Sequence, residues 1–166
     1  MSRMLALACA LVVFALAAGT VSTGALAQQA ATPPYGAPIT LDDAKRVMAA
    51  SELEAAKNSW QVAITILDSG GNLVMFHKAD NTQLASIAAS EGKARTALTF
   101  KRPSKALEDV LGSGPSGLRI LGFGAMPAEG GVLVVVDGKI VGAIGASGGT
   151  SDQDGLAAKA GADSVK

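Results

Sequence analysis

The sequence predicts an α+β domain in which two pairs of strands alternate with helices. Residues 132–149, VLVVVDGKIVGAIGASGG, hold two β-prone segments joined by Asp137-Gly138. Asp-Gly in this setting favours a type I′ turn, because that turn needs positive φ at both central residues. An earlier pair of β-prone segments, residues 60–67 and 73–77, flanks the turn sequence DSGGN. Helical patterns lie between and around the two pairs, an order typical of α+β folds.

The later strand pair is unusual in its glycine content. Its first strand, Val132 to Val136, is apolar without alternation, which predicts a strand covered on both faces. Its second strand and the residues after it contain Gly142, Gly145, Gly148 and Gly149. Glycine within a strand is typical of a bulge or of close approach by another backbone or a ligand. We therefore expect this hairpin to contribute to the core and also to offer a surface to a ligand or a second subunit.

Helical periodicity predicts four helices. The first runs from a cap at Thr40 to Lys57, and the last follows the capping sequence that starts at Thr150. Between them lie a long helix over residues 82–100 and a short one over residues 105–111, which Ser104 is expected to cap. In the long helix, the stripe expected to face the core consists of Leu84, Ile87, Ala88, Ala94 and Leu98, and the pair Glu91 and Arg95 falls on the same stripe.

Residues 112–117, GSGPSG, match the G-x-G-x-x-G pattern of dinucleotide-binding proteins. We reject that function, because the segment follows a helix rather than a strand and Pro115 lacks the N–H that a phosphate would need. The segment is expected to be a flexible loop. Residues 118–123 are then expected to form a helical turn or a short strand.

The first 27 residues have the features of a secretory signal peptide. Arg3 precedes an apolar stretch from Leu5 to Ala18, and Ala25-Leu26-Ala27 offers an A-x-A cleavage site. A membrane anchor is the alternative, but the apolar stretch is shorter than the roughly 20 residues that span a bilayer. A lipoprotein would use Cys9, which lies inside the apolar stretch. The expected location is therefore periplasmic or secreted.

Residues 28–38, QQAATPPYGAP, are expected to be a flexible linker, since they contain three prolines and no apolar periodicity. Tyr35 is the exception, because it can fold back onto the domain or onto a neighbouring subunit. The remaining residues, 39–166, form the predicted domain.

Composition excludes several classes of function. The chain has 14 basic and 14 acidic residues and no basic stripe, which argues against a nucleic-acid partner. The one cysteine, Cys9, lies in the predicted signal peptide, so thiol chemistry and disulfides are not expected in the mature protein. After cleavage of the signal peptide, contact with a membrane is not expected either. The single histidine and the lack of a metal-ligand cluster in the sequence argue against a zinc or triad enzyme, and no catalytic residue can be named.

Three ordered motifs resemble the GlcG/HbpS-like family of haem-binding or haem-degrading proteins. They are Asp68-Ser69-Gly70-Gly71 in the first turn, Lys93-Ala94-Arg95-Thr96-Ala97 in the long helix, and the run from Gly130-Gly131 through Asp137-Gly138 to Gly148. The resemblance extends from Thr40 to the C-terminus. It implies a profilin-like antiparallel sheet of about five strands with packed helices, usually assembled into a homo-oligomer, and a haem ligand.

The family resemblance also directs attention to particular side chains. After the second strand, where relatives commonly carry Arg-Met-Asp, this chain has His77-Lys78-Ala79-Asp80, and Leu133 replaces a frequent proline. His77 is the expected iron ligand, because neutral imidazole is a common axial ligand of haem. The expected cofactor-binding residues are His77, Lys78, Lys93, Thr96 and Met126, with the lysines facing haem propionates and Met126 or Met75 offering a thioether.

Two other interpretations remain open at this stage. His77 can be an ordinary surface histidine at a strand end, and the methionines can be core residues. The protein can also be an enzyme or binding module for a small carboxylic acid, with Lys93 and the backbone of residues 142–149 as the anion site. A purely structural oligomer is the third alternative.

Overall fold

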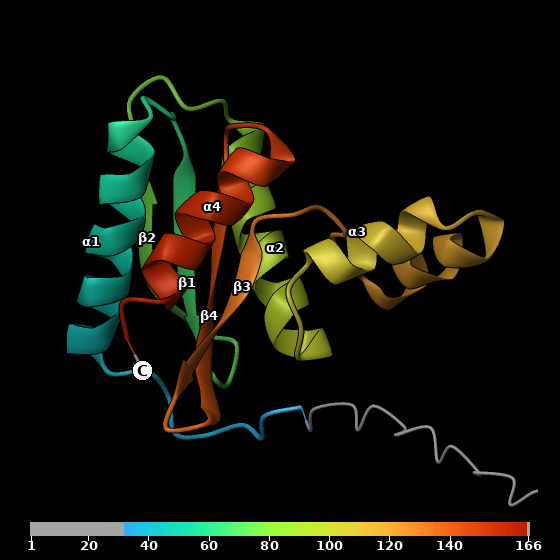
Figure 1. Cartoon of the computed structure of the whole chain (residues 1–166), viewed down its shortest axis with the longest axis horizontal. Coiled ribbons are helices and arrows are strands. Elements are labelled where there is room, and N and C mark those ends of the chain that lie inside the picture. The colour runs from blue at the N-terminus through green and yellow to red at the C-terminus, as the bar shows by residue number, and fades with distance from the viewer. Residues whose placement is uncertain (1–31, 166) are drawn as a thin grey trace, which may run out of the picture. The chain divides into compact units, whose positions relative to one another are not determined.

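The computed structural model describes residues 32–165, so the predicted signal peptide and the start of the predicted linker lie outside the described residues. The element order confirms the α+β prediction (Figure 1). No helix within this range has the length and hydropathy needed to cross a membrane. The elements are α1 (Leu41–Lys57), β1 (Ala63–Asp68), β2 (Leu73–Lys78), α2 (Ala85–Phe100), α3 (Lys105–Gly112), the 3-10 helix η1 (Pro115–Phe123), β3 (Gly131–Val136), β4 (Lys139–Ser147) and α4 (Ser151–Ala162).

Over the described residues the sheet has four antiparallel strands in the order β2-β1-β4-β3. The expectation of about five strands is therefore one too many. The N-terminal segment, residues 32–39, does reach the hairpin of β3 and β4. There Ile140 N–H donates to Pro34 O and Gly36 N–H donates to Ile140 O, both at 2.8 Å. It forms a single bridge at Tyr35 rather than a strand, because its prolines cannot donate to a ladder.

Both predicted hairpins form, and their turns have the expected chemistry. Asp137 and Gly138 have φ of 50° and 71°, as a type I′ turn requires. In the other turn, the Asp68 carboxylate accepts hydrogen bonds from the N–H groups of Gly70 at 2.8 Å and Asn72 at 2.9 Å. Local polar contacts of this kind favour a turn without help from the rest of the domain.

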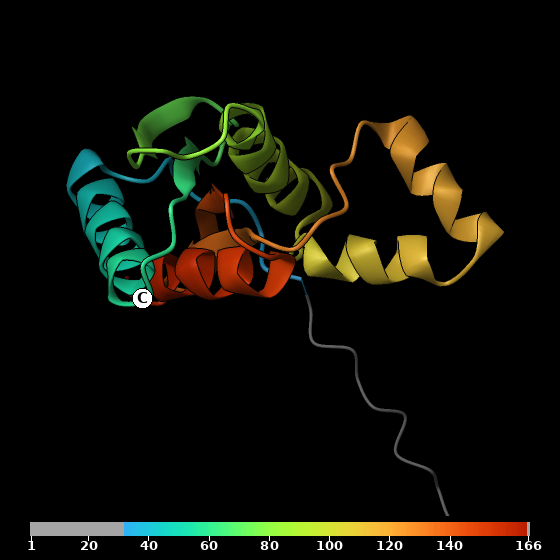
Figure 2. The same cartoon turned by 90° about the horizontal axis from the view of Figure 1, so that it is seen from above.

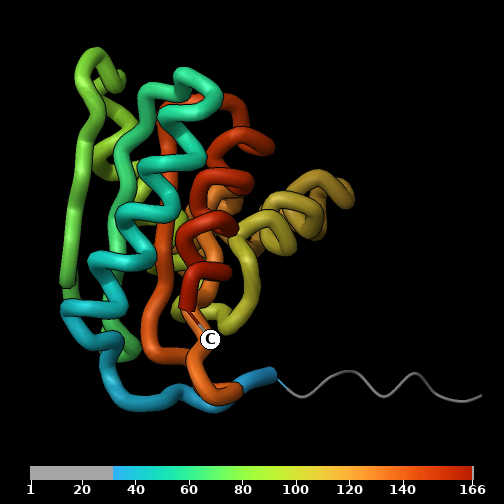
Figure 3. The backbone as a smooth tube through the Cα atoms, turned by 60° about the vertical axis from the view of Figure 1, so that its left-hand side comes forward, coloured from blue at the N-terminus to red at the C-terminus, as the bar shows by residue number. Residues whose placement is uncertain are grey.

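Helices cover the sheet on both faces. Helices α1 and α4 lie side by side on one face, and α2 lies on the other (Figures 1 and 3). Strand β1 therefore contributes to two clusters, with Ile64 and Ile66 under α1 and α4, and Leu67 against Ala94 and Ala97 of α2. A strand buried on both faces has no reason to alternate apolar with polar residues.

The glycines of the hairpin allow α2 to approach the sheet closely. Gly145 pairs with Gly131 across β4 and β3. A Cβ added at Gly145 would lie 2.0 Å from the carbonyl oxygen of Ser90, and one at Gly131 would lie 2.1 Å from that of Lys93. The close approach predicted for this surface is therefore made by a helix of the same chain, on the face that α2 covers.

The predicted core stripe of α2 is wrong in its N-terminal half. Leu84 is 81% exposed and Ile87 is 41% exposed, whereas Ala94 and Leu98 are buried as expected. The helix buries small or polar side chains instead, because a backbone that lies this close to the sheet leaves little room for larger ones. The buried residues are Ser86, Ser90, Lys93, Ala94, Thr96, Ala97 and Leu98.

Helices α3 and η1 pack mainly against each other and project away from the sheet (Figure 2). Only Ser113 and Gly114 join them, so the expectation of a flexible loop over residues 112–117 is wrong: Gly112 ends α3 and residues 115–117 begin η1. Residues 118–123 also belong to η1, which confirms the helical alternative. Ser104 stands at the N-cap position of α3, but its side chain does not make the expected capping hydrogen bond. Its hydroxyl accepts a hydrogen bond from Gly131 N–H at 2.8 Å and donates to Ala128 O at 2.6 Å, so it ties the start of α3 to β3.

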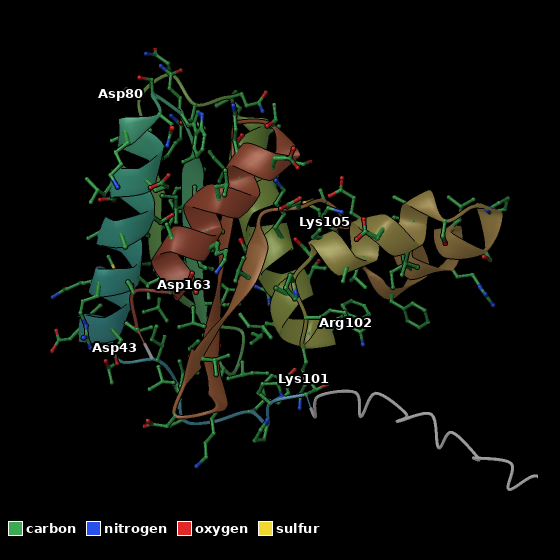
Figure 4. The ribbon with its side chains drawn as sticks, viewed as in Figure 1. Asp43, Asp80, Lys101, Arg102, Lys105 and Asp163 are labelled. Carbon is green, nitrogen blue, oxygen red and sulfur yellow. The ribbon has the colours of Figure 1, made fainter. Side chains whose placement is uncertain are left out.

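Tyr35 folds back onto the domain, which is the first of the two contacts that the sequence allowed for it; the other was with a neighbouring subunit. Its hydroxyl donates to Leu98 O at 2.7 Å, and the Lys101 ammonium lies 4.2 Å from the centre of its ring. Lys101, labelled in Figure 4, comes directly after the C-terminal end of α2 and lies beside the N-terminal segment. Residues 32–38 are thus held against the domain.

Candidate functional site

His77 lies near the end of β2 and faces α1. Its Nδ1 is 2.7 Å from Oε1 of Glu52, and both side chains are about two-fifths exposed, at 43% and 40%. The Nδ1–H bond does not point toward the Glu52 oxygen closely enough for a hydrogen bond, so the contact between the two side chains is electrostatic. Nδ1 is buried, whereas Nε2 is not buried and has no hydrogen-bond partner among the described residues. The free nitrogen of the ring is therefore the one that a ligand can reach.

An apolar pocket of about 200 Å³ opens beside this pair of side chains. Its lining includes Ala79, next to Asp80, which Figure 4 labels just beyond β2. Apart from Glu52 and His77, its walls are apolar or aromatic: Ala55, Ala56, Trp60, Val62, Ile64 and Ala79. An apolar hollow with a few convergent polar groups is the usual form of a small-molecule site.

The pocket fits haem in its chemistry but does not enclose it. An imidazole backed by a carboxylate is a common metal ligand, and an apolar wall with an indole suits a porphyrin edge. The volume is below the roughly 300–1,000 Å³ of sites that surround a drug-sized ligand. A haem at His77 would therefore be covered on part of its surface by this chain and exposed on the rest.

Lys93 is placed elsewhere, in a buried ion pair. Its ammonium donates to Asp154 Oδ2 at 2.6 Å and to Ala146 O at 3.2 Å, and the two side chains are 6% and 3% exposed. Asp154 also accepts from Gly149 N–H at 2.9 Å. The Lys93 ammonium and the Gly149 N–H, which were expected to bind a carboxylate ligand, thus contact Asp154 of the same chain. The pair links α2 to α4 past the end of β4.

Thr96 and Met126 are brought together, away from His77. The Thr96 hydroxyl accepts a hydrogen bond from Met126 N–H at 2.8 Å. The Met126 side chain packs over Gly92, where an added Cβ would lie 3.0 Å from its sulfur. Neither residue lines the pocket beside His77. These two expected ligand residues therefore connect α2 to the loop before β3.

Lys78 and Met75 also lie apart from the pocket. Lys78 pairs with Ala63 and His77 with Ile64, so their side chains point to opposite faces of the sheet. The Lys78 ammonium donates to Ala79 O at 3.3 Å. Met75 packs against the cluster under α1 and α4, which agrees with its interpretation as a core residue.

Glu52 and Trp60 were not among the site residues predicted from the sequence. Glu52 lies on the predicted first helix, and nothing local marks it out from Glu54 two residues later. Trp60 could not be found from the predicted hairpin either, because a register shift between Ile66 and Leu67 is what pairs His77 with Ile64 and turns the imidazole to the face of residues 62 and 64. The packing of α1 across that face decides which helical side chain meets the imidazole.

Comparisons with known proteins point to one relationship. The family model described as "Haem degrading protein HbpS-like" matches residues 39–163. Protein GlcG of Escherichia coli (strain K12) is 40% identical over 108 residues, covering 63% of this chain and 77% of GlcG. The crystal structure of HbpS is 28% identical with a TM-score of 0.70, covering 79% of this chain and 92% of that one. A crystal structure of a PduOC–haem complex, at 23% identity and a TM-score of 0.70 over 78% of this chain and 96% of that one, shares the fold.

Proposed function

Since the chain belongs to the HbpS-like family, as its motifs predicted, we propose that it binds haem with His77 as an axial ligand of the iron. The observation that carries this proposal is the imidazole at the mouth of an apolar pocket, with Nδ1 against Glu52 and Nε2 free. Haem supplies the iron, and the chain supplies the ligand nitrogen and an apolar wall that includes Trp60.

Titration of the purified protein with haemin tests this function. The protein should be untagged, because His77 is the only histidine of the chain and a histidine tag would add competing imidazoles. We expect a shifted Soret band that saturates at a fixed stoichiometry, and His77→Ala should weaken binding by at least about tenfold. Lys45→Ala, an exposed position on α1, is the control for unspecific attraction of propionates. Equal binding by the wild type and His77→Ala would contradict the proposal.

Sequestration and breakdown of haem share this binding step and differ in the fate of the bound haem. We propose that the protein holds haem, because the contacts at His77 supply a ligand and an apolar surface. Incubation of the complex in air with ascorbate separates the two activities. A stable Soret band supports sequestration, and progressive loss of the band that depends on His77 supports breakdown.

A second copy of the chain is the proposed partner of the α3 and η1 pair. Four large apolar side chains on these helices are between 41% and 73% exposed, namely Val110, Leu118, Leu121 and Phe123. Apolar groups gathered on a projecting element favour association with another chain. Light scattering should show a defined oligomer that Phe123→Ser weakens. A monomer at all concentrations would contradict this proposal.

Export is proposed on the basis of residues 1–27, which lie outside the described residues. A periplasmic or secreted haem binder would meet haem from outside the cell. Expression of the full chain, followed by mass measurement of the exported protein, should give a product that begins at Gln28. An intact N-terminus on protein that stays in the cytoplasm would contradict export.

A further inference from the structure

We propose that Glu52 is a positioning residue that makes Nε2 the nitrogen through which His77 binds iron. The inference rests on the proposed function and extends it to a residue that no motif of the sequence indicated. It is based on the surroundings of the two ring nitrogens and on the charge beside one of them.

The two nitrogens of His77 have different environments. Nδ1 is buried and has the Glu52 carboxylate oxygen 2.7 Å away, so iron cannot approach it without displacing α1. Nε2 is not buried and is the nitrogen left for a ligand. An imidazole that binds metal through Nε2 carries its proton on Nδ1, and a carboxylate at this distance stabilises that proton.

The Glu52 carboxylate also changes the donor strength of the imidazole. A negative charge beside the Nδ1 proton raises the electron density of the ring and makes it a stronger ligand for ferric iron. In the structure the Nδ1–H bond is not aimed at the Glu52 oxygen. Because both side chains are partly exposed, a small rotation of either can align them when iron binds.

Other charged groups do not replace Glu52 in this position. Glu54 lies on the same helix but contacts Lys57 at 3.5 Å and the side-chain amide of Asn58 at 3.1 Å. Within the pocket lining, Glu52 is the one acidic residue. A substitution that removes its charge and keeps its shape therefore tests the carboxylate alone.

The experiment compares Glu52→Gln with Glu54→Gln, which makes the same chemical change two residues away on α1. Haemin titration gives the affinity, and spectroelectrochemistry gives the ferric/ferrous reduction potential of the complex. We expect Glu52→Gln to lower the haemin affinity by about 10–100-fold and to raise the reduction potential, with Glu54→Gln matching the wild type. A merely structural role for Glu52 would leave the potential unchanged.

The outcomes separate the two proposals. If His77→Ala loses haem while Glu52→Gln keeps the affinity and potential of the wild type, the role of Glu52 is overturned and haem binding through His77 stands. If His77→Ala binds haem as the wild type does, both are overturned. Circular dichroism of each variant shows whether the helix content is retained, and a Glu52→Gln protein that is folded yet binds weakly at a higher potential supports the inference.

Discussion

At Gly145 the lack of a side chain allows α2 to lie against β4. An alanine there would place its Cβ 2.0 Å from Ser90 O and 2.7 Å from Ala94 N, both backbone atoms of the helix. We expect Gly145→Ala to cost about 1–3 kcal/mol or more, because the helix must move away from the sheet. Urea unfolding measures the loss. Gly112→Ala is the control, since no atom lies within 4 Å of its added Cβ, and equal losses in both variants would contradict this role of Gly145.

A second prediction for individual residues follows from the buried pair of Lys93 and Asp154. Lys93→Met should destabilise the protein by about 3–5 kcal/mol, because it leaves the Asp154 carboxylate buried without its partner. Adding Asp154→Asn should recover part of the loss, since the amide oxygen can still accept from Gly149 N–H. Chemical denaturation of the three proteins measures both effects. Lys105→Met, which breaks an exposed pair with Asp109, should change little.

The raised pKa of Glu129 predicts that the stability of the protein depends on pH. Burial raises the pKa of its carboxyl above the ordinary 4.5, and the nearby Asp152 carboxylate adds to the shift, while Lys105 opposes it. The folded state therefore binds more protons than the unfolded state, and stability falls as pH rises from about 4.5 through the raised pKa. Glu129→Gln should be more stable than the wild type at about pH 7 and equal to it at about pH 4. Unfolding curves at the two values check this, and a gain that persists in acid would contradict the assignment.

At the scale of elements, α2 is where prediction from pattern and observed packing differ most. Helical periodicity favoured a face that includes Leu84 and Ile87, but in that half the helix buries Ser86 and Ser90 instead. Apolar periodicity indicates which face of a helix avoids water. Over a glycine-rich surface, the space between helix and sheet decides which face is buried, and it favours small side chains. Periodicity alone does not report that space.

The consequence for α2 can be measured. Leu84→Gln should leave the free energy of unfolding within about 0.5 kcal/mol of the wild type, because the side chain is 81% exposed. Ala97→Leu should cost about 1–3 kcal/mol, because it adds volume against the sheet. If Leu84→Gln proved the more damaging, the exposed face of α2 would have to be covered by another chain in solution.

At the scale of the whole molecule, the N-terminal segment connects distant parts of the domain. Its backbone hydrogen bonds reach Ile140 and Val141 of β4, and Tyr35 bonds to the end of α2. Tyr35→Phe should lower stability by about 0.5–1.5 kcal/mol, the usual net value of one hydrogen bond, and Tyr35→Ala should lower it further by removing the ring beside Lys101. Thermal unfolding of the chain cleaved at Ala27 measures both, and no change in either variant would contradict the contact.

Several features of the fold were predictable because they depend on neighbours in the chain. The Asp137-Gly138 turn, the Thr40 and Thr150 caps and the hairpin at Asp68 each rest on contacts between residues at most four positions apart. Three ordered motifs were also enough to predict the family. For the candidate site, the sequence indicated His77, and the remaining expected residues lie away from the pocket beside it.

The rest depends on contacts between segments far apart in the chain. The partner of Lys93 is 61 residues away, and the helix that covers Gly145 lies some fifty residues before it. Glu52 meets His77 only because α1 packs across the face of β1 and β2. Such pairings are selected by shape and burial over the whole domain, so no local pattern encodes them. They determine that Gly131 and Gly145 receive α2 and that the imidazole has one free nitrogen beside an apolar pocket.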